Sequence, residues 1–331
     1  MPRAFRLNLT RFLLLAVLIQ HPGPSSGQQV FRGGSDAVRV FVTVTDRDGR
    51  LVTTLTRDNF EVRDDGKPQP LTQYDNSPQP IRLIVMLDVS GSMEGNLQLL
   101  RDAAAQLFSR LLPDDLARVG VFGHEVRISP SFTRNADELL AALPTAIAPD
   151  ALTPLWRALD DAIGAFDRTD ASRKVILVLS DGKDSGPIGF RQRPGSQAGV
   201  IDRARLEDVM IYAVGLRSRR ARPGTPGPGP GGLQAMLLSD LPDPGLARVA
   251  EETGGGYTEI RLGQDLGAAF ASVADELHTQ YLLGFAPPRR DGKTHEIDVR
   301  INKGGLKPRA RKSYVAPQAE TGRVPDAGLA S

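Results

Sequence analysis

The spacing of hydrophobic residues differs between the ends and the middle of the chain. Every second residue from Val38 to Val44 is valine, with polar or aromatic residues between, and this two-residue period predicts a β-strand. Asp46–Gly49 has the composition of a hairpin turn. Phe60–Arg63 and Asp64–Lys67 repeat the same order of strand and turn. The N-terminal flank is therefore expected to be β-structured.

The C-terminal flank carries a matching set of short strands. Tyr281–Phe285 and His295–Ile301 have strand patterns, Arg289–Lys293 has the composition of a turn, and Arg311–Val315 can add one more strand. Each flank alone offers too few strands for a stable sheet with a covered face. We therefore expect the two flanks to pack together as one β-sandwich that the middle of the chain interrupts.

The middle of the chain alternates apolar strands with amphipathic helices. The predicted strands are Ile81–Asp88, Ala117–Phe122, Lys174–Ser180, Asp208–Leu216 and a short one near Tyr257, and Glu125–Ile128 can pair with the second of them. The predicted helices are Asn96–Leu112, Asn135–Leu143, Pro154–Phe166, Leu246–Glu252 and Gln264–His278. Such alternation is typical of an α/β fold with a doubly wound, mostly parallel sheet, covered by helices on both faces.

Composition and the N-terminus narrow the class of protein. The 331 residues are 40% hydrophobic and 24% charged, which is ordinary for a globular protein. The chain has no cysteine, so thiolate zinc sites and thiol nucleophiles are excluded, and its four histidines are scattered. Arginines flank an apolar run at Phe12–Ile19, and small residues follow, which is the layout of a signal peptide over residues 1–27. No other segment is apolar enough to predict a membrane span.

The charge balance argues against a nucleic-acid partner. Cleavage before Gln28 would take away three of the 41 basic residues and leave 38 beside the 39 acidic ones. The arginines of Arg217–Gly232 stand in a Pro-Gly tract without interleaved aromatic residues, which predicts a surface loop, as does the composition of Ser185–Ala198.

Three oxygen side chains follow the first apolar strand of the middle region. Asp88, Ser90 and Ser92 lie on the turn after this strand, and Asp181 follows a later apolar strand directly. Oxygen ligands suit a hard cation such as Mg²⁺, whereas a polar turn that caps the next helix is the plainer interpretation. Because ligands of parallel sheets bind at the carboxyl ends of strands, the position of Asp88 and Asp181 favours the metal site.

The turn D-V-S-G-S-M resembles the metal-ion-dependent adhesion site of von Willebrand factor A domains. The resemblance covers about Ile81 to Ala274 and assigns Asp88, Ser90 and Ser92 to the first motif, Thr153 to the second and Asp181 to the third. That family usually has glycine before the threonine, where this chain has Leu152, so Thr145 is the alternative. Asp184 lies too far past the motif to be a direct ligand and is expected to be solvated.

The layout also resembles bacterial secreted proteins in which an A domain is set inside a small β domain. The expected division is a signal peptide at 1–27, sandwich strands at 28–80 and 278–316, the A domain at 81–277, and a disordered tail at 317–331. This resemblance implies an architecture and a location outside the cytoplasm, in the periplasm or outside the cell.

The resemblance implies a protein-binding module and not an enzyme. Mg²⁺ or Mn²⁺ held by these residues would take one more anionic oxygen from a Glu or Asp of a partner protein. A metal-dependent hydrolase that uses Asp88 and Asp181 is the alternative, but no His or Lys base accompanies the motifs. A structural domain with a vestigial site is the third interpretation.

Overall fold

A computed structural model describes most of the chain. The described residues are 37–93, 95–148, 150–170, 172–180, 184, 195–217, 244–261 and 265–318. They belong to one compact unit that begins at Asp36. The expected signal peptide, the arginine-rich loop after Arg217, most of the loop after Asp181 and nearly all of the expected tail lie outside the described residues.

The central sheet has the order β10-β9-β8-β5-β6-β7. Its strands are β5 (Ile81–Asp88), β6 (Leu116–Phe122), β7 (Val126–Ile128), β8 (Arg173–Ser180), β9 (Val209–Arg217) and β10 (Tyr257–Arg261). All neighbours pair in parallel except β7, which pairs antiparallel with β6. The mostly parallel sheet expected from the sequence is therefore confirmed.

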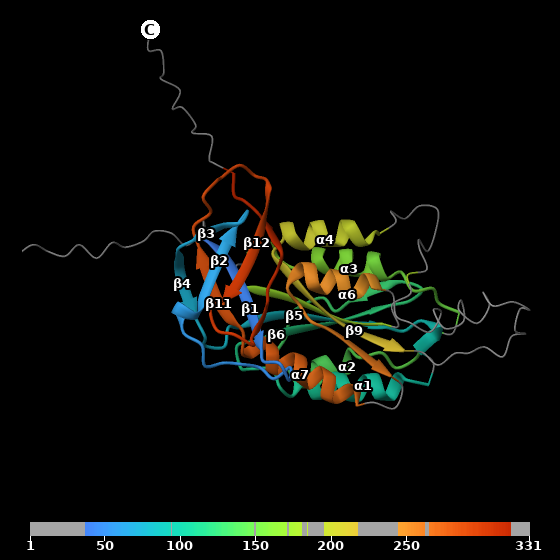
Figure 1. Ribbon diagram of the computed structural model, residues 1–331. Coiled ribbons are helices and arrows are strands. Elements are labelled where there is room, and N and C mark those ends of the chain that lie inside the picture. Colours follow the sequence, from blue (N-terminus) through green and yellow to red (C-terminus); the bar gives the residue numbers. More distant parts are fainter. Residues whose placement is uncertain are drawn as a thin grey trace, which may run out of the picture. The chain divides into compact units, whose positions relative to one another are not determined.

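Helices cover both faces of this sheet (Figure 1). One face carries α1 (Leu97–Phe108), α2 (Ala136–Ala141) and α7 (Leu266–His278), and the other carries α3 (Leu155–Gly164), α4 (Gln197–Leu206) and α6 (Pro244–Thr253). Within β5, Leu83, Val85 and Leu87 pack toward the first set, while Ile84 and Met86 pack toward the second. A strand buried on both sides needs an apolar residue at every position, which explains the continuous run in the sequence.

Two four-stranded antiparallel sheets form the expected β-sandwich. Their orders are β13-β1-β11-β4 and β14-β12-β2-β3. The strands are β1 (Val38–Thr45), β2 (Phe60–Asp64), β3 (Lys67–Gln69), β4 (Leu71–Asp75), β11 (Tyr281–Phe285), β12 (Thr294–Ile301), β13 (Lys307–Arg309) and β14 (Ser313–Val315). Each sheet combines strands of both flanks, and one hydrophobic core lies between them. The fold class predicted from the sequence is confirmed.

Some local expectations need correction. Helix α1 ends at Phe108 and not at Leu112, because the Leu112 N–H donates to the Asp115 carboxylate (2.7 Å) outside the helix. Helix α4 was not predicted, since its buried stripe consists only of Val200, Ile201 and Ala204, while Leu206 is exposed. The hairpin turn predicted at Asp46–Gly49 is confirmed, because Thr45 and Leu51 form an antiparallel bridge across it. Among the described helices, none is both long and apolar enough to cross a bilayer.

Candidate metal centre

Asp88 is the last residue of β5, and its side chain is fully buried. One carboxylate oxygen, Oδ1, accepts a hydrogen bond from the Ser90 N–H (2.9 Å). The other, Oδ2, accepts one from the Ser180 hydroxyl (2.6 Å). These two bonds fix the plane of the carboxylate, and they offset the cost of burying a charged group.

Asp88 lies at the point where the order of strands along the sheet reverses. From β5 the chain first adds β6 on one side and later β8, β9 and β10 on the other. In doubly wound sheets, ligands bind outside the carboxyl ends of strands at this reversal. Asp88 and Ser180 end two adjacent parallel strands, β5 and β8, and therefore lie at that edge.

A second loop reaches the same edge. The Ala148 N–H donates to the carbonyl oxygen of Val89 (2.9 Å), so the segment before α3 lies against the turn after β5. Thr153 follows on this segment, two residues before α3 begins, and is only 5% exposed. Thr145, the alternative in the sequence, is exposed and lines a hollow with Val89 and Ala146.

The remaining predicted ligands are described less fully. Ser90 is buried beside Asp88. Ser92 lies in the short 3-10 helix η2 (Gly91–Met93), of which only the backbone is described at this position. Asp181 lies outside the described residues. Ser180, which the sequence interpretation passed over, directly contacts Asp88; its place at the end of an apolar strand was the available signal.

Two neighbouring residues differ from simple expectation. Asp184 was expected to be solvated, yet it is half-buried and accepts a hydrogen bond from the Trp156 N–H (3.4 Å) in the first turn of α3. A carboxylate is favourable at this end of a helix because the first N–H groups there have no partner within the helix. Leu152 is 46% exposed, so an apolar side chain lies on the surface next to Thr153.

A separate group of acids surrounds His295 in the β-sandwich. The Nδ1 atom of His295 lies 3.0 Å from Asp64 Oδ1 and 3.4 Å from Asp65 Oδ2, and its Nε2 atom lies 3.1 Å from Asp291 Oδ1. Burial alone would lower the pKa of His295, but the hydrogen bonds to Asp291 and Asp64 raise it. One ligand atom from each of Asp64, Asp65 and His295 can be chosen within 4.8 Å of the others, so a metal ion would fit there as well. This group lies on β2, β12 and the turn after β2, and not at the carboxyl ends of the parallel strands.

A family model of the von Willebrand factor type A domain matches residues 83–183. This match begins inside β5 and ends just past Asp181, so it contains the turn after β5, Thr153 and the end of β8. The chain contains a von Willebrand factor type A domain. The resemblance found in the sequence is thereby confirmed.

Solved structures of similar proteins share little sequence with this chain. A von Willebrand factor type A protein from Catenulispora acidiphila is 13% identical, with 88% of this chain and 76% of that chain covered and a TM-score of 0.48. An aerotolerance-related membrane protein from Bacteroides fragilis is 15% identical, with 60% and 98% covered and a TM-score of 0.43. Proximal thread matrix protein 1 from the mussel byssus, with a zinc-occupied MIDAS motif, is 16% identical, with 65% and 49% covered and a TM-score of 0.46.

Among curated proteins, none matches this chain.

Proposed function

We propose that the A domain binds Mg²⁺, or Mn²⁺ in its place, through Asp88, Ser90, Ser92, Thr153 and Asp181, and that the bound metal captures a Glu or Asp carboxylate of a partner protein. The observation that carries this proposal is the buried, doubly hydrogen-bonded Asp88 carboxylate at the carboxyl end of the central strand. The donor set consists of carboxylates and hydroxyls, which suits a hard divalent cation. When bound, such an ion supplies a Lewis-acidic position for one anionic oxygen.

The chain's own residues would have distinct roles. Ser180 and the Ser90 N–H orient Asp88, so that little reorganisation is needed when a cation arrives. Of the two candidate threonines, the buried Thr153 fits a ligand role better than the exposed Thr145. Exposed Leu152 would offer an apolar contact beside the metal.

The proposal includes where the protein works. We infer cleavage of residues 1–27 and release into the periplasm or the exterior, with the A domain at 81–277 held in a β-sandwich from 28–80 and 278–316. Function there would be adhesion-type binding and not catalysis.

The first experiment is a Mn²⁺ and Mg²⁺ titration by calorimetry of the chain from Gln28 onward. We expect saturable binding that Asp88→Ala weakens by roughly 100-fold or more, since even outer-sphere partners are worth about 10- to 100-fold. Asp114→Ala is the matched control, because this exposed aspartate lies near the opposite, amino-terminal end of β6. Unchanged affinity in Asp88→Ala would overturn the site.

Capture of a carboxylate is tested separately with acetate. If an external carboxylate completes the metal shell, added acetate should tighten apparent Mn²⁺ binding, and Mn²⁺ should tighten acetate binding by the same factor. Metal binding that ignores acetate would leave the metal site standing and remove the proposed mode of partner recognition.

A further inference from the structure

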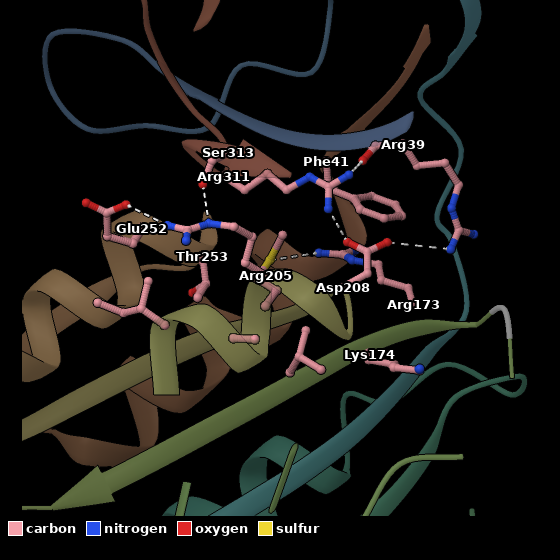
Figure 2. Close-up of a pocket in the computed structure, with 14 residues that line it drawn as sticks. Arg39, Phe41, Arg173, Lys174, Arg205, Asp208, Glu252, Thr253, Arg311 and Ser313 are labelled. Atoms are coloured by element: carbon pink, nitrogen blue, oxygen red, sulfur yellow. Dashed lines mark hydrogen bonds and ion pairs between the residues drawn. The ribbon is translucent and has the colours of Figure 1, made fainter. Parts of the chain in front are cut away.

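A small cavity lies where the β-sandwich meets the amino-terminal ends of β8 and β9 (Figure 2). Its volume is about 30 Å³. Arg39 of β1 and Arg311, just before β14, line it from the sandwich. Arg173 at the start of β8 and Arg205 of α4 line it from the A domain. It lies at the opposite end of the sheet from Asp88, and the metal centre does not use any of these residues.

The lining carries more positive than negative charge. Five basic residues (Arg39, Arg173, Lys174, Arg205 and Arg311) face two acidic ones, Asp208 and Glu252, a formal excess of three positive charges. Asp208 already receives Arg311 in an ion pair and lies 3.8 Å from Arg39. Glu252 lies 3.9 Å from Arg205. The two acidic residues of the lining therefore lie beside Arg39, Arg205 and Arg311.

Arg173 is buried without a carboxylate partner in the described part of the chain. It is 5% exposed, donates to the carbonyl oxygen of Leu277 (2.6 Å) and to the side-chain oxygen of Gln280, and stacks over the ring of Phe41 at 4.4 Å. These direct partners are neutral, and the carboxylates of Glu276, Asp115 and Asp208 act on Arg173 only from beyond ion-pair distance. Burial lowers the pKa of Arg173 to about 10, which still leaves the guanidinium charged at neutral pH. A buried charge whose direct partners are all neutral is costly.

Two lining residues each have a buried donor without an acceptor. The Nε atoms of Arg173 and Arg311 are buried and lack a hydrogen-bond partner among the described residues. Buried N–H groups in folded proteins nearly always find an acceptor. Both Nε atoms lack an acceptor, and Arg173 has no carboxylate within ion-pair distance among the described residues.

We propose that this cavity binds one compact inorganic anion of chloride size, held by Arg173 and Arg311. A cavity needs about 10–15 Å³ on this measure to hold one water molecule, so the space accepts a monatomic ion and excludes a large organic anion. The anion would balance the buried guanidinium and accept hydrogen bonds from the two Nε atoms. Because its ligands come from both parts, it would also stabilise the contact between β-sandwich and A domain. Water could also satisfy the donors, whereas an anion would in addition bring a negative charge into direct contact with the Arg173 guanidinium.

Thermal unfolding of the full chain tests the inference. The melting temperature is measured in sodium chloride and in sodium gluconate at equal ionic strength, over a range of concentrations. A ligand that binds only the folded state stabilises it by mass action, so chloride should give a saturable rise of roughly 2–4 °C that gluconate does not. A third series in sodium sulfate separates chloride from small oxyanions, because specific sulfate binding would also saturate at low concentration.

Two variants assign the effect to the cavity. Arg173→Gln should remove the saturable chloride response. Arg127→Gln removes the same charge from an exposed arginine that pairs with Glu125, and it should keep the response. A response that survives in Arg173→Gln would overturn the assignment.

A crystallographic measurement on the unaltered chain does not depend on whether Arg173→Gln folds. Crystals soaked in sodium bromide should show an anomalous peak between the Nε atoms of Arg173 and Arg311. Equal melting temperatures in chloride and gluconate, together with no bromide peak in the cavity, would show that only water occupies it and would refute the proposal.

Discussion

At the scale of single residues, Ser180 controls how Asp88 is presented. Its hydroxyl donates to Asp88 Oδ2 over 2.6 Å, and both side chains are fully buried. A carboxylate in this position that loses a donor keeps its charge but has less to compensate its burial. Ser180 therefore acts on the proposed metal site through Asp88, as a positioning residue.

Ser180→Ala should consequently lower both stability and metal affinity. We expect a loss of about 1–3 kcal/mol in the free energy of unfolding, because one acceptor is left unsatisfied, and about 10-fold weaker Mn²⁺ binding. Urea denaturation and calorimetry give the two numbers. Ser109→Ala, which removes an exposed hydroxyl bonded to the Gln106 carbonyl, is the control and should change neither. Full Mn²⁺ affinity in Ser180→Ala would show that the hydroxyl does not position Asp88.

At the scale of elements, one buried aspartate joins three segments of the A domain. The Asp115 carboxylate accepts hydrogen bonds from the N–H of Ile81 at the start of β5 (3.0 Å), from the N–H of Leu112 (2.7 Å) and from Nε2 of His278 at the end of α7 (2.8 Å). Burial alone would raise the pKa of Asp115, but these bonds outweigh it and lower the pKa below its ordinary value of 3.8. The charged form of Asp115 thus stabilises the fold.

This lowered pKa predicts an acid-sensitive contribution to stability. A carboxyl group whose pKa is lower in the folded than in the unfolded state stabilises the fold fully above the unfolded value, and the contribution disappears as the pH falls through the folded value. Asp115→Asn should therefore cost about 1–3 kcal/mol at pH 7, and the difference from the unaltered chain should shrink below about pH 4. Urea denaturation between pH 7 and pH 3 measures this. A difference that stays constant over that range would contradict the role given to the charge.

At the scale of the whole molecule, Glu276 connects the β-sandwich to the A domain. Its Oε1 atom accepts from the Thr43 hydroxyl of β1 (2.7 Å), the Tyr212 hydroxyl of β9 and the guanidinium of Arg309 of β13. Gln280 adds hydrogen bonds to Thr43 (2.6 Å) and Tyr212 (3.1 Å). One carboxylate of α7 therefore contacts two neighbouring strands of the β-sandwich, β1 and β13, and also β9 of the A domain.

Removal of this carboxylate should weaken both parts together. Glu276→Ala leaves two hydroxyls and the half-buried Arg309 without their acceptor, and we expect a loss of about 2–3 kcal/mol. Urea unfolding is followed by circular dichroism and by the fluorescence of Trp156, the single tryptophan, which lies in α3. Both transitions should shift equally, whereas Glu125→Ala, at an exposed ion pair, should shift neither. A shift in circular dichroism alone would show that the sandwich unfolds independently.

The strands and helices of the A domain could largely be predicted from local pattern. Strands β5 and β8 are buried on both faces, so their apolar runs are visible without any partner. The turn from Asp65 to Gly66 was also predictable, because its two positive φ angles, 46° and 77°, suit Asp and Gly. Helix α4 was missed, since a ten-residue helix that buries only Val200, Ile201 and Ala204 has a weak amphipathic pattern.

The candidate site likewise has one part that the local sequence predicts and one part that it does not. That Asp88 and Asp181 each follow an apolar strand is a local property, and it was enough to predict an oxygen-ligand site at the sheet edge. That Ser180 donates to Asp88, 92 positions earlier, depends on β5 and β8 being neighbours. Single-sequence patterns contain no strand order, so they could not find this contact.

The sequence by itself determined the type of each long apolar element, the position of its polar end and the family resemblance, because periodicity and turn chemistry act over a few residues. Only the tertiary structure decided which strands are neighbours, that β1 pairs with β11 across more than 200 residues, and that Arg173 is buried with neutral direct partners. Pairing and burial arise from the packing of distant segments. The cavity at Arg173 therefore has no signature in the sequence, whereas the metal motif at Asp88 has a clear one.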